Sequence, residues 1–536
     1  MRKKTVARMM SAVITGSMII SLAACGSSSA PTAESAPVES VAASTGAETT
    51  EETTNTEPLE FSYYGPIWKP YQESTPIFDE LMKRTNTTID FEWVSNDALE
   101  TQLASKVASG DLPDVISGGT SAAPGIQDLI KQGVIVPITD YLEKDMPNYV
   151  RFLEGNDYLT LTNYEDGEIY GFGLVMDVPP AFSTAIRTDW LEKLNLEMPK
   201  TWEDWVTVWK AFAKEDANGN GDPNDEVPFA VSHQFFKFVL NMFGMQSNGE
   251  FSVVDGEYLY DPENPNYEKF LDSMRELYAE GILPKEFVTL EGADFNTLGA
   301  SNTLGSYVGY AEYSKNYTIS CRELDEDAFY QCVIPIPGPD GAQNIPARAK
   351  VSSTTYITVK ALQEGKLERI LQFFDYVYSD EGIELTNYGI EGTNFEMVDN
   401  KPTLVPPYNE SFAVARENGL IPSTIPFCFT EDVYMQILMG GVTYDELEDS
   451  GQTFIDGMTI NEPYYYDEPP VIQTEAYADH FDLLEQQVAL RDKYIMGQIS
   501  KDDYNSGYEK LKQGGLNNVI EQSKDCLLYT SPSPRD

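Results

Sequence analysis

The sequence predicts an α/β fold with two lobes or domains, and two observations carry this prediction. Strand-like and helix-like segments alternate through the first part of the folded chain, which begins near Leu59. Strand–helix–strand units of this kind build parallel sheets, and ligands then bind beyond the carboxyl ends of the strands. About 470 folded residues also exceed what one hydrophobic core usually holds, so we expect two lobes.

Two strands are expected at the start of the folded part. Residues 59–64 have a strand-like composition. Residues 86–94 place Ile89, Phe91 and Trp93 at alternate positions, as on one face of a strand. These two segments predict the first pair of strands, and Trp93 is expected in the core.

A helix is expected next, because Asp97 and Glu100 have the spacing of a capping box. The apolar residues that recur every four positions form one buried face: Leu99, Leu103 and Val107. Gly110 ends this helix, and Asp114 begins the next strand. The resulting strand–helix–strand order favours a parallel sheet.

The N-terminus has the pattern of an export signal. Basic residues precede an apolar run from Met9 to Ile20, which is too short to span a bilayer comfortably. Leu22-Ala23-Ala24-Cys25 resembles the lipobox of bacterial lipoproteins, whose cysteine is acylated, for example with palmitate, and becomes the mature N-terminus. This resemblance implies a signal peptide at residues 1–24 and a lipid anchor on the extracellular face of the cell membrane. The alternative is an ordinary signal peptide followed by a chance cysteine.

The two ends of the chain lie outside the expected fold. Residues 25–58 follow Cys25 without an aromatic side chain, so they cannot bury enough apolar surface to fold and are expected to be a disordered tether. Residues 526–536 resemble a translated sequencing adaptor, so we interpret them as an artefact. In that case the sequence does not fix the position of the natural C-terminus. A genuine polar tail is the alternative.

Charge and cysteine content restrict the partners of the protein. The net charge of −50 repels nucleic acid and anionic lipid, so neither is an expected partner. Cys321, Cys332 and Cys428 remain when Cys25 and Cys526 are set aside, and three cysteines do not make a disulfide framework. Cys321 and Cys332 could pair across a hairpin, but we expect buried free thiols.

Several motifs, in order along the chain, resemble those of the extracellular solute-binding proteins of ABC importers. The resemblance is to the oligosaccharide-binding lipoproteins of family 1 and, more distantly, to maltose-binding protein. It extends over most of residues 59–400. The motifs are Gly110–Val115, Tyr170–Gly173, Ile186–Leu194, Gly281–Phe287, and Ser379–Gly382 followed by Asn387–Gly392.

This resemblance implies a periplasmic-binding-protein-like fold, with two α/β lobes joined by hinge crossovers. The first lobe would hold residues 59–178 and 354–405, and the second residues 179–353 and 406–525. An oligosaccharide would bind in the cleft, and hinge closure would follow because the ligand favours the closed state. The implied partner is an ABC permease, and the protein is expected to be a monomer without enzymatic activity.

A calcium site is predicted in the loop that begins at Asp216. Calcium prefers hard oxygen ligands, and Asp or Asn at alternate positions around a tight glycine turn supplies them. The twelfth position of an EF-hand loop is Val227, not the usual glutamate. A polar turn without metal is the alternative. The expected ligands are Asp216, Asn218, Asn220, Asp222, Asp225 and Glu226.

The tryptophans separate into core positions and one candidate sugar platform. Trp205, Trp209 and Phe212 recur on one face of the helix that Thr201 opens, which is typical of a core stripe. Trp68 instead follows the first strand in a loop, where an aromatic plane could pack on the apolar face of a pyranose. The alternative, that Trp68 packs on the protein surface without contacting a sugar, is equally compatible with the sequence.

Further ligand-binding candidates come from the resemblance. Thr120 and Ser121 follow the third strand, where the family presents groups that bind hydroxyls. Arg187 could reach a sugar hydroxyl or a carboxylate, or it could form a structural salt bridge. For the remaining candidates an ordinary core or surface role is equally open. These are His233, Phe236, Tyr310 and Tyr313.

Catalysis finds little support in the sequence. The chain has two histidines, and the usual metalloprotease, serine-hydrolase and nucleotide-binding motifs are absent from it. An extracellular carbohydrate-active enzyme, a hydrolase or lyase, is the first alternative function, because abundant carboxylates could form a catalytic pair. A peptide-binding receptor is the second.

Overall fold

The structure is a computed structural model, and it describes residues 58–66, 75–95, 98–118, 124–153, 161, 166–179, 181–254, 257–347, 350–352, 354–422, 424–440, 442, 444–472 and 474–530. Residues 54–536 form one compact unit. The predictions for the signal peptide, Cys25, the tether and Asp97 lie outside the described residues. Within the described part, no helix has the length and apolar character that crossing a membrane requires.

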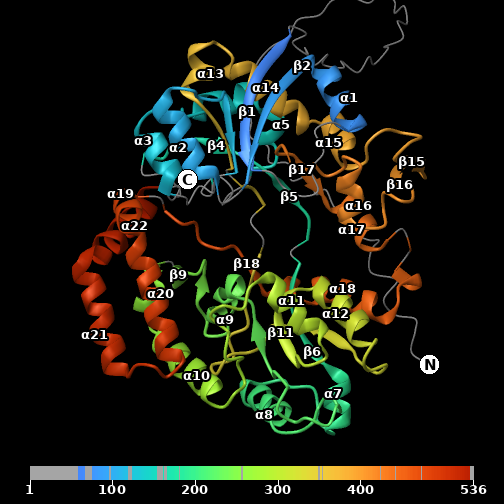
Figure 1. Cartoon of the computed structure of the whole chain (residues 1–536), viewed down its shortest axis with the longest axis vertical. Helices are drawn as coiled ribbons and strands as arrows, with labels where there is room; N and C mark the ends of the chain where they lie inside the picture. The colour runs from blue at the N-terminus through green and yellow to red at the C-terminus, as the bar shows by residue number, and fades with distance from the viewer. Residues whose placement is uncertain are drawn as a thin grey trace, which may run out of the picture. The chain divides into compact units, whose positions relative to one another are not determined.

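The N-terminal sheet has five strands in the order β2-β1-β3-β14-β4 (Figure 1). The predicted strands are confirmed as β1 (Leu59–Pro66), β2 (Thr87–Val94) and β3 (Val115–Ser117), and β1 is parallel to both of its neighbours. β14 (Thr355–Ile357) returns from far along the chain and runs antiparallel to β3 and to β4 (Gly171–Phe172). The sheet is therefore mixed, with a parallel N-terminal half.

Helices accompany the strands of this sheet as the sequence predicted. The predicted helix is confirmed as α2 (Leu99–Ser109), and Gly110 ends it with a φ of 77° in the left-handed region. Leu99 and Leu103 are buried, whereas Val107 is half-buried. Three further helices are α1 (Pro76–Thr85), α14 (Leu367–Val377) and α15 (Asp380–Asn387).

A second sheet has four strands in the order β12-β6-β11-β7. β6 (Phe182–Arg187) is buried along its whole length and pairs antiparallel with β11 (Ser306–Tyr310) and β12 (Tyr330–Val333), while β7 (Ala230–Val231) is parallel to β11. α8 (Trp202–Phe212) begins after Thr201, whose side chain forms a capping box with Asp204. Trp205, Trp209 and Phe212 are buried, which confirms the predicted core stripe.

A third, smaller sheet consists of β8 (Gln246–Ser247), β9 (Phe251–Val254) and β10 (Glu257–Tyr260). Four helices from the end of the chain follow, drawn in red in Figure 1, and their apolar residues share a core with this sheet. They are α19 (Glu475–Asp479), α20 (Phe481–Ile495), α21 (Lys501–Leu511) and α22 (Asn517–Thr530). The last residues of α22 belong to the segment interpreted as an adaptor, and residues 531–536 lie outside the described part.

The remaining elements connect these three groups. The helices are α3 (Pro124–Lys131), α4 (Thr139–Asp145), α5 (Pro147–Val150), α7 (Thr188–Lys193), α9 (Lys237–Asn241), α10 (Tyr267–Ala279), α11 (Gly292–Ala300), α12 (Glu312–Cys321), α13 (Val359–Gln363), α16 (Phe412–Glu417), α17 (Glu431–Leu438) and α18 (Asp449–Ile460). The strands are β5 (Val175–Asp177), β13 (Ile345–Pro346), β15 (Phe395–Val398), β16 (Lys401–Leu404), β17 (Cys428–Thr430) and β18 (Tyr465–Tyr466).

The cysteines are free and buried at positions 321, 332 and 428, as expected. Trp93 is half-buried and packs against the aromatic rings of Tyr63 and Phe91. The α/β class is confirmed, but both main sheets mix parallel and antiparallel pairs. The lobe boundaries at residues 178, 354 and 405 stay a prediction.

Candidate functional site

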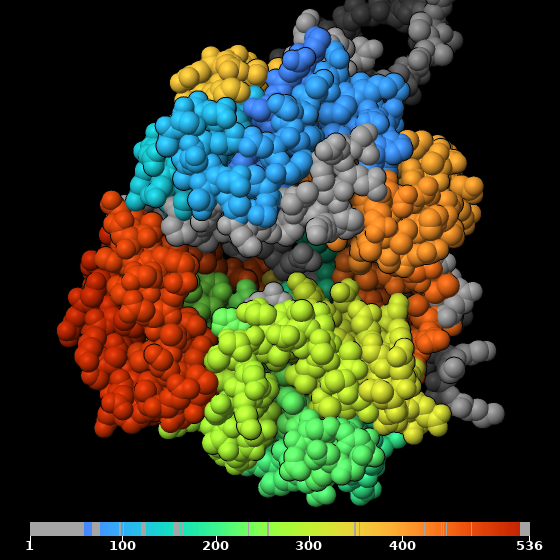
Figure 2. Space-filling model, viewed as in Figure 1, coloured from blue at the N-terminus to red at the C-terminus, as the bar shows by residue number. Residues whose placement is uncertain are grey.

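The candidate site is a cavity of about 540 Å³. Five separate stretches of the chain line it: the end of β3, the region of β5, the end of β11 with the start of α12, the start of β14, and the segment from α16 to α17. Figure 2 shows a hollow in the surface between the yellow-green segment that holds α12 and the orange segment that holds α16 and α17. A volume of this size suits a ligand of a few sugar rings.

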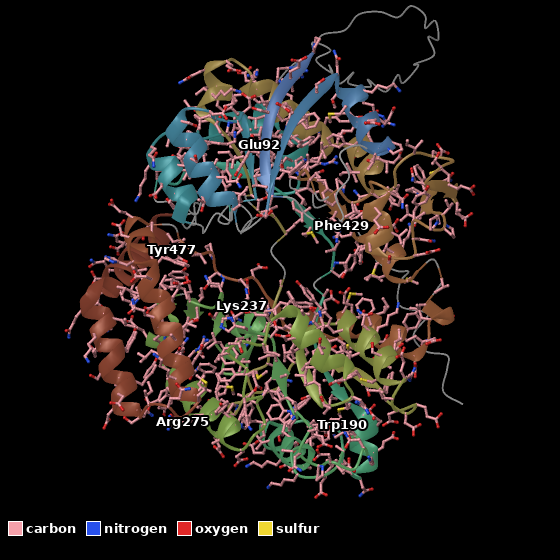
Figure 3. The ribbon with its side chains drawn as sticks, viewed as in Figure 1. Glu92, Trp190, Lys237, Arg275, Phe429 and Tyr477 are labelled. Carbon is pink, nitrogen blue, oxygen red and sulfur yellow. The ribbon has the colours of Figure 1, made fainter. Side chains whose placement is uncertain are left out.

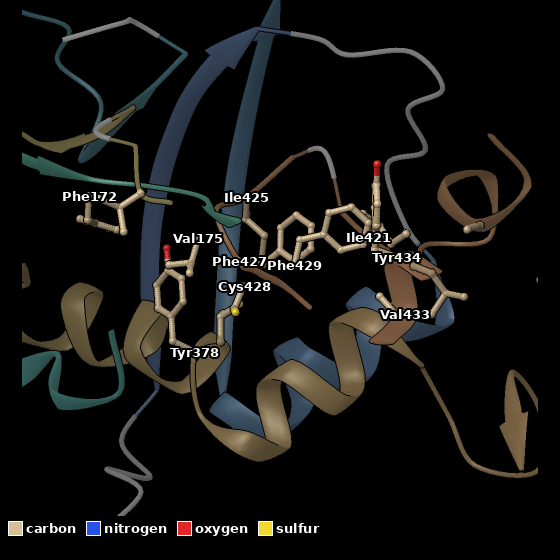
Figure 4. Packing of buried hydrophobic residues seen from close by; sticks show 14 of the residues in the cluster. Phe172, Val175, Tyr378, Ile421, Ile425, Phe427, Cys428, Phe429, Val433 and Tyr434 are labelled. Carbon is tan, nitrogen blue, oxygen red and sulfur yellow. The ribbon is translucent and has the colours of Figure 1, made fainter. Parts of the chain in front are cut away.

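The wall formed by the segment 412–434 is rich in aromatic rings. The rings of Phe412 and Tyr434 stack with centroids 5.5 Å apart, and Phe429 meets Phe412 edge-on at 6.0 Å. Figure 4 shows Phe427, Phe429 and Tyr434 next to one another, with Ile421 and Ile425 beside them. Aromatic planes of this kind can pack on the apolar faces of sugar rings.

Hydrogen bonds hold this wall to the rest of the molecule. β17 pairs in parallel with β5, and the Val175 amide donates to the Phe427 carbonyl at 2.9 Å. The side chain of Asn387 on α15 donates to the Cys428 carbonyl at 2.8 Å and accepts from the Thr430 amide at 3.2 Å. The wall is therefore anchored on both sides, which positions its aromatic rings firmly.

A few polar groups lie among the apolar lining residues. Hydroxyl groups come from β3 and β14, where Ser117 and Thr355 approach within 3.5 Å of each other. Two charged side chains also line the cavity, Glu312 and Arg416. Apolar walls with a small number of polar groups are the usual composition of a site for a small organic ligand.

Of the residues predicted to bind ligand, Tyr310 lines this cavity. Its ring stacks on Phe182 with centroids 5.0 Å apart, and the ring of Tyr313 meets it edge-on at 5.5 Å. Tyr313 is half-buried behind Tyr310 and is not a lining residue. Trp68, Thr120 and Ser121 lie outside the described residues, although the nearby Ser117 and Gly118 do line the cavity.

Arg187 has the structural role that the sequence left open as an alternative. Its guanidinium is fully buried and forms two hydrogen bonds to the carboxylate of Asp189, at 2.8 and 2.5 Å, and one to Asn302 at 2.6 Å. Burial acts to lower the pKa of Arg187, but the bonds to Asp189 raise it above its ordinary value. The side chain is fully buried and does not line the cavity, so we do not pursue it as a binding residue.

Phe236 and His233 also lie away from the cavity lining. Phe236 is 3% exposed and belongs to the core, where the Arg491 guanidinium lies 4.7 Å above its ring. His233 is half-buried on a short 3-10 turn, with Nδ1 3.4 Å from a carboxylate oxygen of Glu291. The structure therefore brings Tyr310 alone, among the described candidates, to the cavity.

The cavity contains residues that the sequence analysis missed: Phe412, Arg416, Phe429 and Tyr434. They come from a segment that carries no family-like motif, and its local sequence does not show that it folds back onto β5. Only the pairing of β17 with β5 brings these side chains to the cavity. A periodic pattern could not have found them.

The predicted calcium loop is a tight turn held by its own side chains. Asp225 accepts hydrogen bonds from the side-chain Nδ2 groups of Asn218 and Asn220, at 3.1 and 2.6 Å, and Asp216 accepts one from the backbone N–H of Gly221 at 3.0 Å. Among the described residues, no three His, Cys, Asp or Glu side chains form a ready metal cluster. This bonding pattern is what a polar turn would also show.

Two buried carboxylate oxygens in this loop nevertheless have no hydrogen-bond partner among the described residues: one of Asp216 and one of Glu226. Burial raises the pKa of Glu226, as expected for an acid removed from water without a counter-ion. Unpaired buried oxygens are costly, and a bound cation would relieve that cost. The loop residues therefore fit a hard cation such as calcium.

The family model for bacterial extracellular solute-binding proteins matches residues 68–384 of this chain. Among curated proteins, the chain is 29% identical over 331 residues to the fructooligosaccharide ABC transporter substrate-binding protein FusA of Streptococcus pneumoniae serotype 4, covering 59% of this chain and 60% of that protein. It is 26% identical over 363 residues to the lipoprotein LipO of Bacillus subtilis, covering 66% and 70%. The chain thus spans about three fifths of the length of the first of these relatives.

Solved structures show the same fold. The alginate-binding protein AlgQ2, in a structure without calcium ion, matches with a TM-score of 0.69 and 22% identity, covering 88% of this chain and 98% of that one. FusA in complex with kestose matches with a TM-score of 0.64 and 22% identity, covering 88% and 100%. These likenesses confirm the predicted two-lobed solute-binding fold.

Proposed function

The chain belongs to the family of bacterial extracellular solute-binding proteins, and on that premise we propose that it captures an oligosaccharide outside the cell and delivers it to an ABC importer. The observation that carries this proposal is the cavity of about 540 Å³, with its aromatic wall and few polar groups. Relatives support the choice of ligand class, since one is named for fructooligosaccharide and another for polygalacturonan and rhamnogalacturonan.

The proposed mechanism is binding without reaction. Tyr310 on one side and the rings of Phe412 and Tyr434 on the other would pack on the sugar rings, while hydroxyl groups such as that of Ser117 would meet the sugar hydroxyls. Trp68, Thr120 and Ser121, which lie outside the described residues, remain proposed ligand residues. The two lobes would close on the ligand, because binding stabilises the closed state.

Two features of the cellular context belong to the same proposal. Cys25 would carry the lipid that anchors the protein to the outer face of the cell membrane, with residues 25–58 as the tether. The protein would act as a monomer and present the loaded lobes to the permease. Mass spectrometry of the protein purified from membranes tests the anchor, since acylation of Cys25 adds the mass of the lipid.

A thermal-shift assay with purified protein tests the ligand class. We expect kestose or an oligogalacturonate, at about 100 times its dissociation constant, to stabilise the fold by about 2.7 kcal/mol and to raise the melting temperature by a few degrees. Tyr310→Ala should reduce this gain, whereas Tyr444→Ala, which removes an exposed tyrosine outside the cavity lining, should not.

Chromatography of the glycans after incubation separates the receptor from the enzyme alternative. A receptor returns every glycan unchanged, whereas a hydrolase or lyase releases shorter products. Cleavage by the purified protein, or a melting temperature that no glycan raises, would contradict the proposal.

We also propose that the loop of residues 216–226 holds a structural calcium ion, with Asp216, Asn218, Asn220, Asp222, Asp225 and Glu226 as the ligand set. A chelator should then lower the melting temperature, because a cation bound only to the folded state stabilises it. Asp225→Asn should abolish the chelator effect. Asp399→Asn, a change in an exposed turn elsewhere, should leave that effect intact, and a melting temperature indifferent to chelator in the parent protein would exclude the ion.

A further inference from the structure

Arg416 is a cation on the wall of the cavity. It lies on α16, a short helix that Ser411 caps by accepting a hydrogen bond from the Val414 amide at 3.2 Å. Phe412, one turn earlier on the same helix, lines the cavity together with Arg416. The helix therefore presents an aromatic ring and a guanidinium to the same space.

The guanidinium of Arg416 has no hydrogen bond or ion pair with any part of the chain that the structure describes. This is notable in a protein with 86 acidic residues against 36 basic ones, where acids are at hand for almost any cation. Arg322, for comparison, forms a two-pronged bond to Asp449 at 2.9 and 2.7 Å. Within the described residues, the cavity thus holds a cation that has no protein partner.

Arg416 is an exposed residue of the cavity lining, so its guanidinium is accessible to a ligand. Partial loss of water around the guanidinium lowers its pKa. An arginine still stays protonated at physiological pH, so its charge persists. Among the lining residues, the other charged side chain is Glu312, which already interacts with another group of the protein.

The geometry points to a negatively charged glycan as the ligand: we propose that Arg416 binds the carboxylate of a uronic acid residue while the adjacent aromatic rings pack on its sugar ring. This deepens the proposed function and rests on it. The planar fork of a guanidinium matches a carboxylate with two parallel hydrogen bonds, which a neutral hydroxyl cannot reproduce. A partly desolvated cation therefore gains most from an anionic partner.

The acidic surface does not oppose this selectivity. Charges on the outer surface are screened beyond about 8 Å at physiological ionic strength. A carboxylate in the cavity, by contrast, would meet the guanidinium at contact distance in a partly apolar environment, where the attraction is strongest. Direct contact with Arg416 therefore matters more for a bound carboxylate than the net charge of the molecule.

Titration calorimetry with matched glycans tests this inference. The probes are trigalacturonate, its fully methyl-esterified form, which has the same sugar rings without the charges, and kestose as an unrelated neutral glycan. We expect the parent protein to bind trigalacturonate about 10- to 100-fold more tightly than the ester, as charge-assisted hydrogen bonds allow. Arg416→Gln should abolish this preference and Arg416→Lys should restore part of it.

Arg322→Gln is the matched control, because it removes an arginine outside the cavity lining and should keep the preference. The melting temperature of each ligand-free variant shows whether the fold is intact. If the parent protein binds the ester or kestose as tightly as trigalacturonate, or if Arg416→Gln weakens acid and ester equally, the inference is overturned while the proposed function stands. If none of the three glycans binds, both are overturned.

Discussion

Two regions of the molecule each contain an arginine, but only one of these arginines has hydrogen-bond partners in the described chain. At the end of β6, Arg187 is fully buried, and its guanidinium donates three hydrogen bonds to Asp189 and Asn302. The rings of Trp190 and Tyr330 lie 4.8 and 5.4 Å from the guanidinium. Figure 3 labels Trp190 in this region. At the cavity, Arg416 lies on an aromatic wall without a partner in the described chain.

The contrast shows that the environment of a charge, and not the residue type, separates a structural role from a binding role. A buried arginine whose donors are all used contributes to the fold. An arginine whose donors face a cavity unused is available to a ligand. Three stability measurements can break or sharpen this distinction.

The largest effect is expected for Arg187→Met. The change leaves the nearly buried carboxylate of Asp189 without its cation, which should lower the free energy of unfolding by about 3–5 kcal/mol. Denaturant unfolding measures this loss. Adding Asp189→Leu should recover part of this loss, because the unpaired carboxylate is then removed. A loss below about 1 kcal/mol for Arg187→Met alone would contradict a structural role for Arg187.

A buried acid without a cation should produce the next largest effect. Glu250 accepts hydrogen bonds from Tyr477 at 3.1 and 3.3 Å, and Figure 3 labels this tyrosine among the C-terminal helices. Burial raises the pKa of Glu250 from 4.5 to about 7, the bonds from Tyr477 oppose the rise, and the charge of Asp261 adds to it. The folded state therefore holds the proton more tightly than the unfolded state does.

Stability from Glu250 is thus fully present below pH 4.5 and is lost as the pH rises through about 7. The loss should amount to about 2–3 kcal/mol. Unfolding free energies at pH 5 and pH 8 measure it: Glu250→Gln should flatten the difference, whereas Glu257→Gln, at an exposed site on β10, should not. If the free energy of unfolding changes by the same amount between pH 5 and pH 8 in the parent and in Glu250→Gln, then Glu250 is ionised in the folded protein at both pH values.

The smallest effect is expected for Arg416→Gln in the absence of ligand. The side chain makes no bond in the described chain, so its removal should change the free energy of unfolding by less than about 0.5 kcal/mol. Denaturant unfolding beside Arg187→Met gives the direct comparison. If Arg416→Gln lowers the free energy of unfolding as much as Arg187→Met does, both arginines have a structural role.

Local patterns made most of the fold predictable. The buried face of α8 and the strand–helix–strand start of the chain follow from spacing within a few residues, which a sequence displays directly. Tyr310 was predicted through a resemblance to relatives, and it does line the cavity. The role of Tyr310 as a ligand residue stays a prediction.

The cavity wall was not predictable in the same way. β17 meets β5 across about 250 residues of chain, and no local pattern encodes that pairing. The role of Arg187 was left open for a related reason, since its partner Asn302 lies 115 residues away. Whether a polar side chain is already satisfied depends on such distant partners.

The cavity is assembled from five separate stretches of the chain, so it can form only late in synthesis. A polypeptide made from its N-terminus possesses no enclosed wall until Tyr434 has emerged and β17 has docked beside β5. Contacts between residues this far apart in sequence form slowly, because closing the long loop between them costs entropy before the contacts stabilise the chain. An incomplete chain therefore lacks the full cavity wall, and only a completely folded molecule can bind a ligand there.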